Sequence, residues 1–149
     1  MKKLVITVGN ELMGDDAAGP LLAHLLEENP LSDWEVIDGG TTPENSLPYV
    51  RQMQPDLVMV VDTAEMGLEP GSIRLIPPEE IADQLLLSTH TLPLTYLIRA
   101  LKEFVPEVYL LGIQPRDVIF GLPLYVIVKH AVISVYKKLQ EGRLDFETL

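Results

Sequence analysis

The stretch V-G-N-E-L-M-G-D-D-A-A-G-P, residues 8–20, is the most informative part of this chain. An apolar run at residues 4–8 leads into it and a leucine-rich helical pattern follows from Leu21, which predicts a loop between a buried strand and a helix. Its glycines resemble those of a phosphate-binding loop, but Asp15 and Asp16 would repel phosphate, and neither G-K-[ST] nor G-x-G-x-x-G is present. The loop therefore suits a cation held by carboxylates better than a nucleotide.

The composition limits the partners of the chain. With 149 residues, of which 47% are hydrophobic, it is long enough for one well-buried core, and we expect a single domain over 1–149. The formal net charge of -11 argues against non-specific binding to nucleic acid or to an anionic membrane. The apolar run that starts at Leu4 meets Gly9 too soon for a signal peptide or a membrane span. We expect a cytoplasmic monomer without membrane insertion.

The chain has no cysteine, which excludes a disulfide frame, a thiolate nucleophile and a cysteine-type zinc site. Serine hydrolase chemistry has no support either, because G-x-S-x-G is absent and Ser88 stands only two residues from His90 with no orienting acid nearby. The segment V-D-T-A at residues 61–64 imitates the D-T-G of aspartic proteases, but it occurs once and in an α/β pattern. These absences argue against a covalent acyl-enzyme.

Short apolar runs alternate with helical patterns along the whole sequence. Strands are expected at 4–8, 34–37, 57–61, 72–76 and 108–114, and helices at about 17–28, 42–53, 93–104 and 122–139, with a short helix opening at 77–80. The alternation predicts the α/β class: a single three-layer α/β/α domain with a mostly parallel, five-stranded twisted sheet of the phosphorylase/hydrolase-like kind. The alternating run at 72–76 suits a sheet edge, and residues from Gly142 onward are expected to fray.

Three aspartates follow predicted strand ends. Asp16, Asp38 and Asp62 should therefore lie near the carboxyl edge of the sheet, where parallel sheets bind their ligands. His90 stands in the polar segment S-T-H-T between apolar elements. Asp16, Asp62 and His90 together offer two oxygens and one imidazole nitrogen, which suits nickel, zinc or another divalent ion with open positions. Asp38 is either a fourth member or an Asp-Gly turn residue, and the turn is favoured.

Structural roles compete with these functional ones. One of Asp15 and Asp16 can cap the next helix, and capping by Asp15 would leave Asp16 available for function. His24 and His130 fall on the polar sides of amphipathic helices, so we expect them at the surface.

Five ordered blocks resemble a known family. They are G-N-E-L-M-G-D-D at 9–16, I-D-G-G at 37–40, V-D-T-A-E-M-G at 61–67, T-H-T-L-P-L at 89–94 and G-I-Q-P at 112–115. With these blocks the chain resembles the hydrogenase maturation proteases over about residues 3–140. It looks closest to the type that processes the large subunit of formate-hydrogenlyase-like, membrane-associated [NiFe] hydrogenases.

The resemblance implies an endopeptidase that removes the C-terminal extension of a [NiFe] hydrogenase large-subunit precursor after nickel insertion. The nickel belongs to the substrate, so no tightly bound cofactor is implied. The metal-contacting residues of the family fall on Asp16, Asp62 and His90, while Asp16 and Asp38 are candidates for the catalytic base. The family usually has glycine after the second acid, where this chain has Ala17.

Two other functions use the same residues. A nickel-binding assembly factor would inspect the large subunit without cutting it. A self-contained metallohydrolase would carry its own zinc and would cleave unrelated peptides.

Overall fold

The computed structural model describes residues 1–77 and 91–149. The predicted helix at 77–80 and the segment with Ser88 and His90 therefore lie essentially outside the described residues. The elements are β1 (Lys3–Thr7), η1 (Gly14–Ala17), α1 (Ala18–Glu28), β2 (Trp34–Asp38), η2 (Pro43–Ser46), α2 (Leu47–Met53), β3 (Leu57–Thr63), β4 (Ile73–Leu75), α4 (Thr91–Lys102), β5 (Glu107–Ile113) and α5 (Val126–Gln140), where η marks a 3₁₀ helix.

In the described part of the chain, the sheet has five strands in the order β2-β1-β3-β5-β4. Strands β2, β1, β3 and β5 are parallel, and β4 pairs antiparallel with β5 at the edge. Every residue of β3 is buried, as expected of a central strand covered on both faces. The predicted mostly parallel sheet and its edge strand are confirmed.

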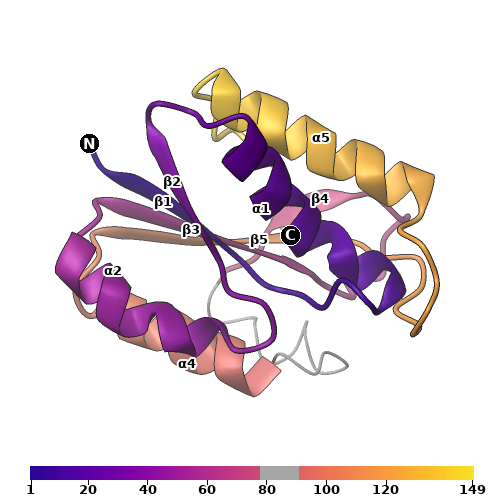
Figure 1. Ribbon diagram of the computed structural model, residues 1–149, viewed down its shortest axis with the longest axis horizontal. Coiled ribbons are helices and arrows are strands. Elements are labelled where there is room, and N and C mark those ends of the chain that lie inside the picture. The colour runs from indigo at the N-terminus through magenta and orange to yellow at the C-terminus, as the bar shows by residue number, and fades with distance from the viewer. Residues whose placement is uncertain (78–90) are drawn as a thin grey trace.

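Helices cover both faces of the sheet (Figure 1), because successive residues of a strand point to opposite sides. Val58 and Val60 of β3 belong to a core cluster with residues of α2 and α4. Met59 and Val61 belong to the other cluster, with residues of α1 and α5. The three-layer α/β/α architecture is confirmed, and two apolar cores stabilise it.

The chain changes its winding direction between β1 and β3. Helix α1 connects β1 to β2 on one face, and α2 connects β2 to β3 on the opposite face. From β1 the chain continues to β2, and from β3 it continues toward β5 and β4, which lie on the other side of this strand pair. Open α/β sheets bind their ligands at such a point, outside the carboxyl ends of the strands.

Several boundaries differ from the sequence-based expectation. Strand β3 continues through Asp62 and Thr63, because β5 offers both residues a pairing partner. The expected helix at 42–53 consists of η2 followed by α2, with a proline in the first turn of each. The last helix begins at Val126 instead of Leu122, whose N–H donates to the Ile119 carbonyl in a turn.

The C-terminal residues are attached to the sheet edge, so the expectation that they fray is wrong. Leu75 N donates to Glu147 O at 2.8 Å, and Leu149 N donates to Leu75 O at 2.9 Å. These bonds supply pairing for the otherwise open side of β4. The ordering of this segment follows from an unpaired strand edge about seventy residues earlier in the chain, which no local pattern indicates.

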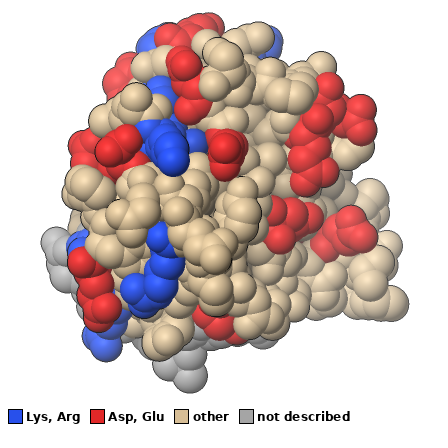
Figure 2. Space-filling model, turned by 60° about the vertical axis from the view of Figure 1, so that its left-hand side comes forward, with Lys and Arg blue, Asp and Glu red and all other residues tan. Residues whose placement is uncertain are grey.

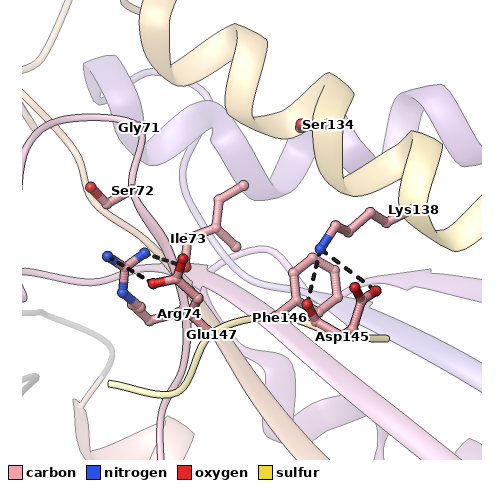
Figure 3. Close-up of a pocket in the computed structure, with 9 residues that line it drawn as sticks. All are labelled: Gly71, Ser72, Ile73, Arg74, Ser134, Lys138, Asp145, Phe146 and Glu147. Atoms are coloured by element: carbon pink, nitrogen blue, oxygen red, sulfur yellow. Dashed lines mark hydrogen bonds and ion pairs between the residues drawn. The ribbon is translucent and has the colours of Figure 1, made fainter. Parts of the chain in front are cut away.

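A pocket of about 350 Å³ lies between β4, α5 and the C-terminal segment (Figure 3). Its two cations are engaged by acids of that segment: Arg74 lies 3.4 Å from Glu147, and Lys138 lies 3.7 Å from Asp145. The hydrogen bond from Arg143 also holds the pKa of the Asp145 carboxyl below its usual value. Arg74 and Lys138 therefore serve mainly to fasten the C-terminus.

Charged side chains at the surface reflect the acidic composition. On the face shown in Figure 2, basic side chains lie close to acidic ones, while acidic side chains also occupy areas without a basic neighbour. Within residues 1–77 and 91–149, no helix is long and apolar enough to cross a membrane.

Candidate functional site

The loop between β1 and α1 folds back onto the end of its own strand. Gly9 makes this possible, since its φ is 147° and a Cβ there would overlap the carbonyl oxygen of Asp16. Gly9 N also donates to Gly40 O at 2.9 Å, which ties the loop to the turn after β2. The close approach brings Asp16 back to the carboxyl edge of the sheet.

Asp16 and Asp62 meet at Thr63, although they come from different elements. The Asp16 carboxylate accepts hydrogen bonds from Thr63 Oγ1 at 2.8 Å and from Asn10 N at 2.8 Å. Asp62 Oδ1 accepts from Thr63 N at 2.8 Å. Only 5% of Asp16 and 1% of Asp62 are exposed. The structure thus brings two of the three predicted metal-contacting residues to one point of the sheet edge.

Buried carboxylates are costly unless they are hydrogen-bonded, paired or bound to a metal. Two of them on one residue, Asp16 at the Thr63 hydroxyl and Asp62 at the Thr63 N–H, are therefore hard to explain by packing alone. Carboxylate oxygens are suitable ligands for a divalent cation, and imidazole would suit nickel beside them. The local chemistry of Asp16 and Asp62 fits a metal-contacting role, which stays a prediction.

Asp15 has a different role from its neighbour. Its carboxylate accepts from Arg116 N at 2.7 Å, Asp117 N at 3.1 Å and Tyr125 N at 2.7 Å. Neither η1 nor α1 has a side-chain cap, so the idea that one of the two aspartates caps the next helix is wrong. The reason is that the segment before α5 offers Asp15 three N–H donors. Asp15 fastens that segment, whereas Asp16 faces Asn10 and Thr63.

Gln114, directly after β5, is a polar residue to which sequence reasoning gave no role. Its Oε1 accepts from Met66 N at 2.7 Å, and its Nε2 donates to Glu65 Oε2 at 3.0 Å. Gln114 thereby holds the loop that follows Asp62 and Thr63. Its position after a strand end was the available signal, since it lies at the same edge as the three predicted aspartates.

Asp38 and His90 stand apart from the pair. Asp38 is exposed at the end of β2, and its Oδ1 accepts from Gly40 N at 3.1 Å, which is the favoured turn role. His90 lies outside the described residues, so its place relative to Asp16 and Asp62 stays a prediction. In the part of the chain that is described, no three His, Asp or Glu side chains are grouped to hold a metal. His24 and His130 are exposed, as expected.

Comparisons with known proteins agree with this architecture. A family model described as hydrogenase maturation protease matches residues 20–141. The hydrogenase 3 maturation protease of Escherichia coli is 46% identical over 151 residues, covering 100% of this chain and 97% of the relative. A putative hydrogenase maturation protease of Methanocaldococcus jannaschii is 36% identical over 129 residues, covering 80% of this chain and 76% of the relative.

Solved structures give the same result. The solution structure of an endopeptidase HycI from Escherichia coli has a TM-score of 0.93 at 46% identity, covering 100% of this chain and 97% of that one. A [NiFe] hydrogenase maturation protease HycI from Thermococcus kodakarensis has a TM-score of 0.83 at 27% identity, with 94% and 90% covered. The chain therefore belongs to the hydrogenase maturation protease family. The predicted family, the fold and the endopeptidase activity are confirmed.

Proposed function

We propose that this endopeptidase removes the C-terminal extension of a [NiFe] hydrogenase large-subunit precursor, and that nickel already inserted in the precursor is what its site binds. The observation that supports this proposal is the convergence of two nearly buried carboxylates, Asp16 and Asp62, on Thr63 at the switch point of the sheet. The proposed substrate is a hydrogenase subunit that already contains nickel. This metal can therefore serve as a recognition element for the enzyme.

Each residue then has a definite task. Asp16 and Asp62 offer oxygen ligands to the nickel of the precursor, and His90 is the predicted nitrogen ligand. A metal shared by enzyme and substrate fixes the scissile segment, which turns a mobile tail into a positioned one. A carboxylate beside the positioned peptide bond accepts the proton of the attacking water. Asp16 suits this task better than Asp38, because Asp38 is exposed and engaged in a turn.

The first test is cleavage itself. A purified monomer, as the cytoplasmic enzyme is expected to be, is mixed with nickel-loaded precursor of a formate-hydrogenlyase-type hydrogenase. The mass of the large subunit should fall by that of its extension. Binding without any loss of mass would instead favour the inspecting assembly factor. Cleavage of unrelated peptides by protein purified with zinc would favour the self-contained metallohydrolase.

His90→Ala should abolish cleavage while leaving the melting temperature nearly unchanged. Its sequence context is polar, so we expect the side chain to contribute a metal ligand and little to the core. The matched control is His130→Ala on the exposed side of α5, which should cleave like the parent. Normal cleavage by His90→Ala would remove the residue from the site.

Processing by the parent should also weaken as the pH falls through about 6.5, where a free histidine protonates and no longer ligates.

A further inference from the structure

Five large apolar side chains are exposed in two loops at the carboxyl edge of the sheet. Phe120 is the most exposed of the five, at 73%. We call this set the apolar rim; it consists of Leu12, Val118, Ile119, Phe120 and Leu122. Single exposed apolar residues are ordinary, but a group of them confined to neighbouring loops usually marks an interaction surface.

The two loops are joined by hydrogen bonds. Gly121 N donates to Leu12 O at 3.0 Å, which brings the two parts of the apolar rim together. Asp15 N donates to Asp117 O at 2.9 Å, and the Asp15 carboxylate accepts the three N–H bonds described above. A buried acid therefore orders a segment that has no regular secondary structure. Ordering before contact lowers the entropic cost of binding, which favours a docking surface over an incidental loop.

The apolar rim is continuous with the site. Leu12 lies in the loop that carries Asp16, and its N–H donates to the Asn10 side chain at 2.9 Å while Asn10 N donates to Asp16. In Figure 1 the loop after β1 and the segment before α5 lie at the same end of the sheet, opposite the N-terminus. A protein whose tail reaches Asp16 must therefore place its adjoining surface close to the apolar rim.

We propose that the apolar rim docks an apolar patch on the folded precursor, next to the base of its C-terminal extension. This inference rests on the proposed function. The occupant should be a protein surface because the rim side chains are 43–73% exposed on two adjoining loops, which suits contact with another extended surface. Interfaces of this kind have an apolar centre with polar surroundings. Nickel would then position the tail, and the apolar rim would select the protein that carries it.

The test uses Phe120→Ser and Ile119→Ser in the full chain. The matched control is Tyr49→Ser, which removes a side chain that is 54% exposed on α2, a helix on the face of the sheet opposite α1 and α5. Cleavage of nickel-loaded large-subunit precursor is measured at varied precursor concentration, together with direct binding and the melting temperature. Each rim variant should weaken binding and raise KM about tenfold, the effect of losing a central apolar contact, with kcat unchanged. Tyr49→Ser should match the parent.

Unchanged KM and binding in both rim variants would overturn the inference while the cleavage activity stands. If the parent binds the precursor through the apolar rim but never cleaves it, the docking surface stands and the proposed function fails. If the rim variants change the oligomeric mass of the free enzyme but not its binding to the precursor, the apolar rim is a contact between copies of this chain. That result would also overturn the inference. If Phe120→Ser lowers the melting temperature, the KM and precursor binding of Ile119→Ser are used to judge the inference.

Discussion

Replacement of Asp16 by asparagine is expected to lower precursor cleavage by at least about a hundredfold, the smallest effect usual for loss of a general base. The change removes a negative charge that both proposed tasks of the residue need. It should leave the fold intact, because the amide oxygen can accept from Asn10 N while the amide nitrogen donates to Thr63 Oγ1. A hydroxyl is both donor and acceptor, so Thr63 can reverse its role.

The measurement compares the rate of mass loss of the precursor and the urea midpoint of the variant with those of the parent. Asp33→Asn is the matched control, since Asp33 is an exposed aspartate just before β2. The control should be indistinguishable from the parent in both measurements. Normal cleavage by Asp16→Asn would mean that the buried carboxylate has a structural role only.

Asp15→Asn should have the opposite effect, a large loss of stability. An amide has one acceptor oxygen, whereas the Asp15 carboxylate accepts from Tyr125 N with one oxygen and from Arg116 N and Asp117 N with the other. At least one N–H group would lose its acceptor and face the amide donor. Each unsatisfied buried group costs about 1–3 kcal/mol, so we expect a loss of about 2–4 kcal/mol in the free energy of unfolding.

Urea unfolding followed by circular dichroism measures this loss as a lower midpoint at an unchanged slope. Cleavage by the molecules that remain folded should persist, though with weaker binding of the precursor if the apolar rim loosens. A variant within about 0.5 kcal/mol of the parent, the usual range of surface substitutions, would contradict the role given to Asp15. Substitution of Asp16 is thus predicted to reduce activity, whereas substitution of its neighbour Asp15 is predicted to reduce stability.

The convergence of Asp16 and Asp62 was predictable from the sequence because it depends on local patterns. Each residue follows or ends an apolar run, and the alternation of strands and helices places such ends at one edge of a parallel sheet. The pattern could not show that the Thr63 hydroxyl donates to Asp16, since that contact depends on the path of a loop 47 residues away. The extension of β3 through Thr63 likewise depends on partners in β5.

The role of Asp15 was not predictable, because its donors lie about a hundred residues further along the chain. A local pattern suggested the commonest use of such an aspartate, a helix cap, and tertiary structure supplied stronger partners. The same reason explains the C-terminus, where acids and main-chain groups pair with β4. Periodicity predicts elements and their faces, whereas contacts between distant loops follow only from the assembled fold.

The most direct test of the proposed function compares the same precursor with and without nickel, at matched concentration and salt. The enzyme is used as the parent chain and as Asp16→Asn, and the mass of the large subunit is followed over time. We predict that the parent cleaves only the nickel-loaded precursor and that Asp16→Asn cleaves neither form. Equal cleavage of the nickel-free precursor by the parent would contradict recognition through the metal of the substrate.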